Sequence, residues 1–225
     1  MRILLVVATE PEIAPLLGRL QHVSGSERFR TYRMNNAELH VVVSGVGMVA
    51  TAAETAFHVG KSPYDLLINA GICGSFNREI QIGEVVNVVS EFQPELGAED
   101  HDEFISVFDL GIADKNRWPY RNGWMELSTR CDNFSSLRKC KSVTVNTVSG
   151  DQQTVDHLNA SIAPDVESME GAGFIRAALM TDIPSVQIRA VSNYVEPRDR
   201  SKWDIPLAIN NLNEALFNEL IAITK

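Results

Sequence analysis

The feature that most constrains this chain is an uninterrupted apolar run close to its N-terminus. Residues 3 to 7 are Ile-Leu-Leu-Val-Val. A strand with one face in water alternates apolar and polar residues, whereas an uninterrupted apolar strand is typical of a parallel sheet covered on both faces. Segments 65–70 and 184–192 predict further strands of this kind of sheet. We therefore expect an α/β fold.

The rest of the chain alternates between predicted strands and predicted helices. Asn35-Asn36 is a hairpin turn signal between two strands, at 29–34 and 38–44. The other strands are expected at 84–92, 142–148 and about 164–167. The helices are expected at 10–20, at 48–58, from about 169 onward and from 204 onward.

Composition and charge limit the classes of function. With 225 residues, 44% of them apolar, the chain can form a single domain over 1–225 with a sizeable core. A net charge of −9 argues against nucleic-acid or anionic-membrane partners. Cys73, Cys131 and Cys140 lack metal-type spacing, which fits a reducing cytosol. No signal peptide or membrane-spanning run is evident, so we expect a cytoplasmic protein. The sequence also suggests no metal and no cofactor.

A carboxylate stands at a predicted strand-to-helix corner in the segment 164–176. The strand is expected to end near Glu167 and the helix to begin near Met169, with Ser168 as a candidate N-cap. Glu170 then lies in the first helical turn, where the helix dipole favours a negative charge. Such corners are also where open α/β sheets bind ligands, so a structural and a functional role both remain open for Glu170.

Polar or small residues follow the carboxyl ends of several predicted strands. They are Glu12, Gly71, Asp151, Glu170 and Asn193, each after a different strand. In an α/β sheet these strand ends can share one edge. Isolated first-turn carboxylates need no common explanation, but polar groups collected on one rim indicate a binding site.

The segment 94–122 is long, irregular and acidic. A connection of this length is usually a lid, a binding loop or an oligomer contact. His101 lies within Glu-Asp-His-Asp-Glu. We interpret this stretch as a solvated acidic loop and not as a metal site.

Four motifs together resemble the purine nucleoside phosphorylase and nucleosidase superfamily. They are Val-Glu-Ser-Met-Glu-Gly-Ala-Gly-Phe, Gly-Ile-Cys-Gly after the strand 65–70, Ser-Gly-Asp151, and Arg-Ala-Val-Ser-Asn193. They occur in the family's order and span most of the chain. The resemblance implies a three-layer α/β/α sandwich with a twisted, barrel-like, mixed and mostly parallel sheet. It also implies a purine nucleoside substrate and cleavage of its N-glycosidic bond.

The resemblance assigns roles to individual residues. Glu170 matches the glutamate that holds the ribose hydroxyls, and Met169 matches the methionine packed against the sugar. A hydrolase also needs a carboxylate that takes a proton from water, and Glu12 matches that residue. Asp151 belongs to the Ser-x-Asp corner that lies beside the base pocket in the family. Gln153, which stands where relatives often have a stacking aromatic residue, and Thr154 are further candidate base contacts.

Two departures from the family pattern predict the subclass. Bacterial phosphorylases have an arginine and a serine where this chain has Asn69 and Ile72, and an apolar side chain cannot hold phosphate. This favours hydrolysis. Adenine nucleosidases have an aspartate in place of Asn193. An asparagine cannot protonate N7 of the base, but it can donate a hydrogen bond to O6 or N7, which suits a 6-oxopurine.

The segment 192–203 resembles the futalosine hydrolases of the alternative menaquinone pathway, and 96–100 is also similar. The implied reaction releases hypoxanthine from futalosine, which carries a carboxyphenyl ketone on its 5′ side. Arg198 or Arg200 can bind that carboxylate, although loop salt bridges are the commoner use of such residues. We also expect a homodimer or larger homo-oligomer, in which 94–122 covers the 5′ group. The alternatives are a methylthioadenosine or adenosylhomocysteine nucleosidase, a phosphorylase, and a non-catalytic nucleoside sensor.

Overall fold

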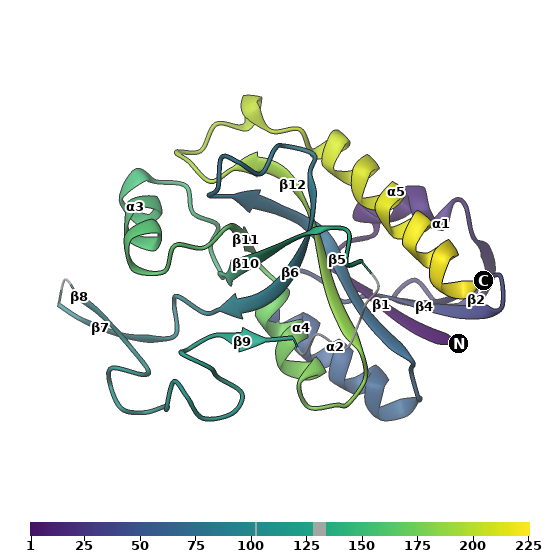
Figure 1. Cartoon of the computed structure of the whole chain (residues 1–225), viewed down its shortest axis with the longest axis horizontal. Helices are drawn as coiled ribbons and strands as arrows, with labels where there is room; N and C mark the ends of the chain where they lie inside the picture. The colour runs from purple at the N-terminus through teal and green to yellow at the C-terminus, as the bar shows by residue number, and fades with distance from the viewer. Residues whose placement is uncertain (102, 128–133) are drawn as a thin grey trace.

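A computed structural model describes residues 1–101, 103–127 and 134–225 (Figure 1). Cys131 and Asp102, which belong to the thiol and acidic-loop predictions, lie outside these residues. Ten of the described strands form one mixed sheet, in the order β11-β10-β6-β12-β5-β1-β4-β3-β2, with β9 paired to β6. The strands of this sheet are β1 (Arg2–Val7), β2 (Gln21–Gly25), β3 (Phe29–Met34), β4 (Ala37–Val43), β5 (Leu66–Ser75), β6 (Val85–Phe92), β9 (Met125–Glu126), β10 (Arg138–Thr144), β11 (Val166–Ser168) and β12 (Ser185–Tyr194).

One extra pairing closes part of the sheet into a ring. β11 runs parallel to β10 and also pairs antiparallel with β5. Strands β5, β12, β6, β10 and β11 therefore form a closed circuit, which confirms the barrel-like, mixed sheet. Parallel pairing of β5 with both β1 and β12 brings the carboxyl ends of these three strands to one edge.

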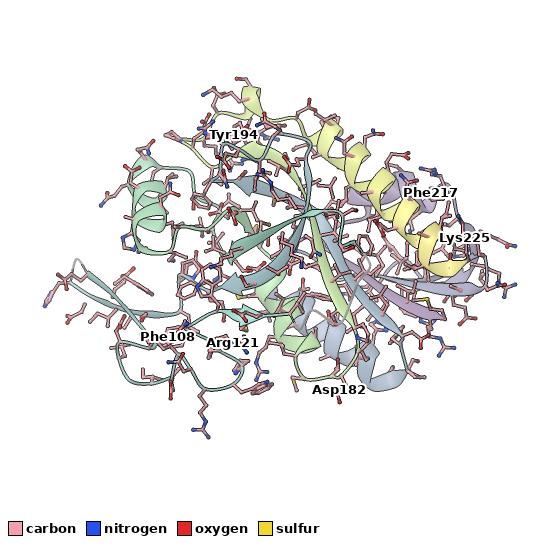
Figure 2. The ribbon with its side chains drawn as sticks, viewed as in Figure 1. Phe108, Arg121, Asp182, Tyr194, Phe217 and Lys225 are labelled. Carbon is pink, nitrogen blue, oxygen red and sulfur yellow. The ribbon has the colours of Figure 1, made fainter. Side chains whose placement is uncertain are left out.

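Helices cover both faces of the sheet, as the apolar run at residues 3–7 predicts (Figure 1). Ile3, Leu5 and Val7 join a core cluster that includes residues of α1 and α5. Leu4 and Val6 point the other way and join a cluster with residues of α4. Figure 2 shows side chains filling the space between sheet and helices. The helices are α1 (Ala14–Leu17), α2 (Met48–Lys61), α3 (Gln152–Ser161), α4 (Gly171–Ala178) and α5 (Ile205–Thr224), with short 3-10 helices η1 (Glu10–Glu12) and η2 (Arg200–Lys202).

The structure corrects the first predicted helix. In place of one helix over 10–20, it has η1, α1 and then the unexpected strand β2. Pro15 stands in the first turn of α1. In a continuous helix its ring would clash with the carbonyl oxygen four residues earlier, so the helical segment is divided.

Other boundaries also differ from the predictions. β5 runs on to Ser75, because β12 pairs with it over the whole distance. β10 ends at Thr144 and not at 148, and α4 has Glu170 as its N-cap residue in place of Ser168. The acidic segment contains a two-stranded hairpin, β7 (Gly97–Asp100) and β8 (Glu103–Ser106). None of the helices within the described ranges is long and apolar enough to cross a bilayer.

Candidate active site

A cavity of about 360 Å³ lies where the carboxyl ends of β1, β5, β11 and β12 meet. The cavity brings together five of the ten predicted site residues, although they are far apart in the chain. Those among its lining are Glu12, Met169, Glu170, Asn193 and Arg198. Sequence reasoning did not include Thr9, Ser149, Glu167 and Trp203, which also line it.

Glu12 is held just past the end of β1 by three donors. The backbone N–H and the hydroxyl of Thr9 both donate to Oε2, each at 2.9 Å. The N–H of Ile72 donates to Oε1 at 3.1 Å. Burial raises the pKa of Glu12 above the ordinary value of 4.5, while the Ile72 donor and the Arg189 charge act in the opposite direction. Glu12 is therefore a fixed carboxylate that accepts a proton more readily than an exposed glutamate.

Glu170 faces the same cavity from the start of α4. The N–H of Gly47, at the N-cap of α2, donates to its Oε1 at 3.2 Å. Gly47 has a φ of +101°, a conformation that favours glycine. Gly47, between β4 and α2, therefore supplies a donor to the candidate site. The side chain of Glu170 is 9% exposed, and its Oε2 lies 3.8 Å from Nη2 of Arg189.

Arg189 is a buried cation beside both glutamates. Its side chain lies in β12, is fully buried, and donates to Oδ1 of Asn69 at 2.7 Å. A Cβ on Gly71 would collide with Nη1 of Arg189 and lie 2.9 Å from Oε1 of Glu12. Gly71 is thus placed in β5, where it leaves room for these charged groups. Nε and Nη1 of Arg189 have no hydrogen-bond partner among the described residues.

A further buried carboxylate, Glu91, supports α4 on the side away from the cavity. Glu91 in β6 accepts from Nε2 of Gln187 at 2.6 Å and from the Thr144 hydroxyl at 2.8 Å. The Thr144 hydroxyl in turn accepts from the N–H of Ala172 at 2.7 Å. Burial raises the pKa of Glu91 to about 7. A Cβ on Gly171 would collide with the Glu91 carboxylate, so the two fit only because position 171 is glycine.

Asn193 and Cys73 line another part of the cavity. The Asn193 amide donates to the carbonyl of Tyr194 at 2.9 Å, and its Oδ1 accepts from the Ser192 hydroxyl at 2.8 Å. One N–H of the amide thus remains for a ligand. Cys73 is a free, buried thiol, and burial raises its pKa to about 12, which disfavours the reactive thiolate.

The two predicted arginines differ in their placement. Arg198 lines the cavity, and its guanidinium lies 4.9 Å from the ring centre of Trp203, which also lines it. Arg200 lies in η2, 5.9 Å from the same ring, and is not among the lining residues.

Three predicted base contacts lie elsewhere. Asp151 is exposed and caps α3, where it accepts from the N–H of Thr154 at 2.9 Å and from its hydroxyl at 2.7 Å. Gln153 and Thr154 line a second cavity of about 680 Å³, between α3 and the β7–β8 hairpin. The two cavities share Ser149.

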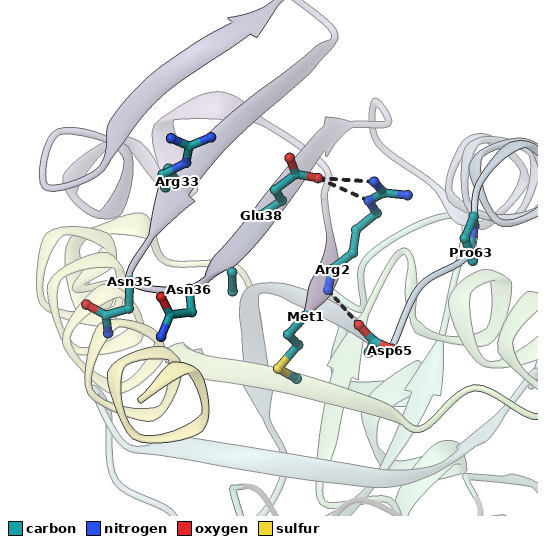
Figure 3. A pocket seen from close by; sticks show the side chains of 9 residues that line it. Met1, Arg2, Arg33, Asn35, Asn36, Glu38, Pro63 and Asp65 are labelled. Atoms are coloured by element: carbon teal, nitrogen blue, oxygen red, sulfur yellow. Dashed lines mark hydrogen bonds and ion pairs between the residues drawn. The ribbon is translucent and has the colours of Figure 1, made fainter.

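A third cavity, of about 630 Å³, lies at the opposite ends of the strands and is lined by polar residues (Figure 3). Arg2 bonds there to Glu38 at 3.2 Å through its side chain and to Asp65 at 2.7 Å through its backbone N–H. Arg2 thus connects the Glu38 and Asp65 carboxylates in this cavity. Within the described ranges, no three His, Cys, Asp or Glu side chains are grouped as metal ligands.

Comparison with known proteins matches residues 2–223 to the phosphorylase superfamily. The chain is 34% identical to a futalosine hydrolase of Acidothermus cellulolyticus over 95% of its length and 87% of that protein. It is 33% identical to a futalosine hydrolase of Streptomyces coelicolor over 78% of its length and 76% of that protein. A Streptococcus pneumoniae MTA/SAH nucleosidase with bound 8-aminoadenine has a similar fold, with a TM-score of 0.80 at 22% identity, covering 99% and 100% of the two chains.

Proposed function

This chain belongs to the phosphorylase superfamily, and from that premise we propose that it is an N-ribosylhydrolase. Its proposed reaction cleaves futalosine with water into hypoxanthine and dehypoxanthine futalosine. The observation that carries the proposal is the pair of carboxylates, Glu12 and Glu170, that line one cavity beside the buried Arg189. The futalosine hydrolases to which the chain is similar support the choice of substrate.

Hydrolysis of a nucleoside passes through a ribosyl cation as the C1′–N9 bond breaks. In the proposed mechanism Glu170 accepts hydrogen bonds from the ribose hydroxyls and stabilises the developing positive charge. Met169 packs against the sugar. Water attacks C1′ while Glu12 takes one of its protons, so Glu12 must enter the reaction ionised. The bond's electron pair leaves with the base as an anion, which takes up a proton from solvent, and Glu12 returns its proton to solvent.

Arg189 makes this arrangement of charges possible. Two buried carboxylates close to one another repel, and each would be driven toward its neutral form. A buried guanidinium next to both lowers that penalty.

The surroundings of Asn69 and Ile72 support water and not phosphate as the nucleophile. Asn69 is fully buried and does not line the cavity, and its amide donates to the carbonyl of Val6 at 2.9 Å and accepts from Arg189. Ile72 has an apolar side chain, and its N–H is used by Glu12. Neither residue offers a phosphate contact.

The two ends of the substrate have separate proposed contacts. Asn193 donates its remaining N–H to O6 or N7 of hypoxanthine, where negative charge develops as the base leaves. Arg198 binds the carboxylate on the 5′ side, with Trp203 packing beside it. Arg200 is a weaker candidate for that role because it lies outside the cavity lining. The 94–122 segment is proposed to cover the 5′ group across a homo-oligomer interface.

The test is chromatography of the products from futalosine, inosine and methylthioadenosine, each with and without phosphate. We expect hypoxanthine from futalosine in the absence of phosphate. Adenine from methylthioadenosine with futalosine untouched would make the protein an adenine nucleosidase. Turnover only with phosphate would make it a phosphorylase. Thermal stabilisation by purines without turnover would indicate a nucleoside sensor.

A further inference from the structure

The cavity contains a third carboxylate, Glu167, that the proposed reaction does not use. Its side chain lines the cavity, although the residue is only 5% exposed. It lies in β11, whose antiparallel pairing with β5 places Glu167 opposite Gly74. β12 pairs with β5 from the other side and places Asn193 opposite the same Gly74. Glu167, Gly74 and Asn193 thus form one row across three neighbouring strands.

A flat ring can bind along this row. The pairing of β12 with β5 shifts register between Val191 and Asn193, and the side chains of Glu167 and Asn193 both line the cavity. Neighbouring strands are about 4.8 Å apart, so the Cα atoms of Glu167 and Asn193 are separated by roughly 10 Å. Gly74 between them has no side chain, and a Cβ there would lie 2.9 Å from Cγ2 of Val195 and 3.2 Å from the Asn193 amide nitrogen, so a larger residue would crowd Asn193. Glu167, Gly74 and Asn193 all line the cavity, so a base bound there can contact the side chains of Glu167 and Asn193 at its edge.

The bonding of Glu167 leaves it able to accept hydrogen bonds from a ligand. The N–H of Ser149 donates to Oε1 at 2.9 Å, and the Ser149 hydroxyl donates to Oε2. Each carboxylate oxygen can accept a second hydrogen bond. Ser149 therefore fixes the direction of the carboxylate without using up its capacity.

The two classes of purine differ in what they present to such a carboxylate. A 6-oxopurine has a donor, N1–H, beside the acceptor O6. A 6-aminopurine has a bare acceptor at N1 beside an amino donor. An ionised carboxylate attracts the first N1 and repels the second, and a buried polar group left unpaired by the wrong ligand costs binding energy.

We propose that Glu167 is a specificity-determining residue that accepts a hydrogen bond from N1–H of a 6-oxopurine, a proposal that rests on the proposed function. Asn193 serves the O6 and N7 edge of the same base. Glu167 and Asn193 thus select hypoxanthine over adenine from opposite sides of Gly74. The competing explanation is that Glu167 only anchors the loop that contains Ser149.

The experiment measures binding of free hypoxanthine, 1-methylhypoxanthine and adenine by calorimetry to the wild-type protein, Glu167→Gln and Ser149→Ala. Methylation removes the N1 donor without changing the protein. We expect the wild type to bind hypoxanthine about 10- to 100-fold more tightly than the methylated base, the range expected for one hydrogen bond to a charged group. Glu167→Gln should reduce this ratio to near one and improve adenine binding, whereas Ser149→Ala should keep most of the preference.

Two results would overturn the proposal. One is equal binding of hypoxanthine and its methylated form by the wild type, which no folding defect can explain. The other is a Glu167→Gln variant that weakens all three bases equally, as loss of a loop anchor would. Binding of free base does not depend on futalosine turnover. A protein that discriminates at N1 but leaves futalosine intact would refute the proposed reaction while supporting the role of Glu167.

Discussion

The chemistry of the site depends first on the charge state of one residue, Glu12. Its pKa is raised by burial above 4.5, so as the pH falls its carboxylate takes up a proton earlier than an exposed glutamate would. A general base must be ionised. We therefore expect kcat/KM for hydrolysis to fall on the acid side with an apparent pKa above 4.5, measured as a pH–rate profile. A rate that stays constant down to pH 4 would be inconsistent with Glu12 as the base.

Asn193→Asp changes the ability to protonate the base. An aspartic acid can donate a proton to N7 of a 6-aminopurine, whereas an asparagine cannot. We expect the variant to gain kcat/KM for methylthioadenosine relative to inosine by about 10-fold or more, since general acid catalysis contributes at least that much. The measurement is the ratio of kcat/KM for methylthioadenosine to kcat/KM for inosine in each protein, so a difference in the fraction of active protein cancels. An unchanged ratio would remove Asn193 from base selection.

Arg198→Ala should affect one substrate and spare another. If Arg198 binds the 5′ carboxylate, its loss should raise KM for futalosine by about 10-fold, the value of a charged hydrogen bond. It should leave inosine, which has no such carboxylate, nearly unaffected. Arg200→Ala is the matched control, because Arg200 contacts the same Trp203 but does not line the cavity. Equal losses with both substrates would argue for a structural role.

Residue types and motif order were enough to predict that Glu12, Met169, Glu170, Asn193 and Arg198 lie around one cavity, whereas their roles in a reaction stay predictions. They were not enough for Asp151, Gln153 and Thr154. A Ser-Gly-Asp motif indicates where the chain turns but not which cavity its side chains face. In the structure the Asp151 carboxylate caps α3 by accepting a hydrogen bond from the N–H of Thr154. Arg189 was seen only as part of a motif. The available signal was that Arg189 lies within the predicted buried strand 184–192. A charged side chain buried in a strand requires partners, so carboxylates near it could have been expected.

Among the elements, α4 carries the ribose-binding candidate and is supported by the buried Glu91. The pKa of Glu91 is about 7 in the folded protein and near 4.5 when unfolded. Its raised folded pKa means that its stabilising contribution is complete below pH 4.5 and is lost as the pH rises to about 7. Relative to Glu91→Gln, the wild type should lose on the order of 3 kcal/mol between pH 4.5 and 8. Urea unfolding of both proteins across this range measures the difference, and parallel curves would contradict it.

The contact between α2 and α4 depends on Gly173. A Cβ at this position would collide with the backbone carbonyl of Met48, which cannot move aside as a side chain could. Gly173→Ala should therefore cost about 1 to 3 kcal/mol of stability and lower kcat/KM, because it separates Gly47 from Glu170. Gly60→Ala is the control, since Gly60 is exposed in α2 with open space around it. Thermal unfolding and activity of both variants test this, and equal behaviour would refute it.

Elements that bury a face were predictable, and those that do not were missed. The run at residues 3–7 indicated a doubly covered strand because both of its faces are buried. β2 is exposed along its whole length, so it has no apolar pattern by which to find it. The end of β5 was placed too early, because small residues at 71–75 are typical of a turn. Here they make room for Arg189 and Glu12 within a strand.

At the scale of the whole molecule, the β7–β8 hairpin and its neighbouring loops extend away from the main sheet (Figure 1). Several large apolar side chains of this segment are exposed, namely Leu96, Phe104, Leu110, Ile112 and Trp118. Exposed apolar groups gathered in one segment mark an interaction surface. We expect light scattering to give at least twice the 24.9 kDa mass of one chain. A monomer at micromolar concentration would contradict an oligomeric 5′ site.

The central claim is that the Glu12 and Glu170 carboxylates hydrolyse a 6-oxopurine nucleoside with water. The most direct measurement is the initial rate of hypoxanthine release from futalosine in phosphate-free buffer, for the wild type and for Glu12→Gln. We predict steady release by the wild type and a decrease of about 100-fold or more in the variant, with hypoxanthine binding retained. No release by the wild type, or equal rates for the two proteins, would contradict the account.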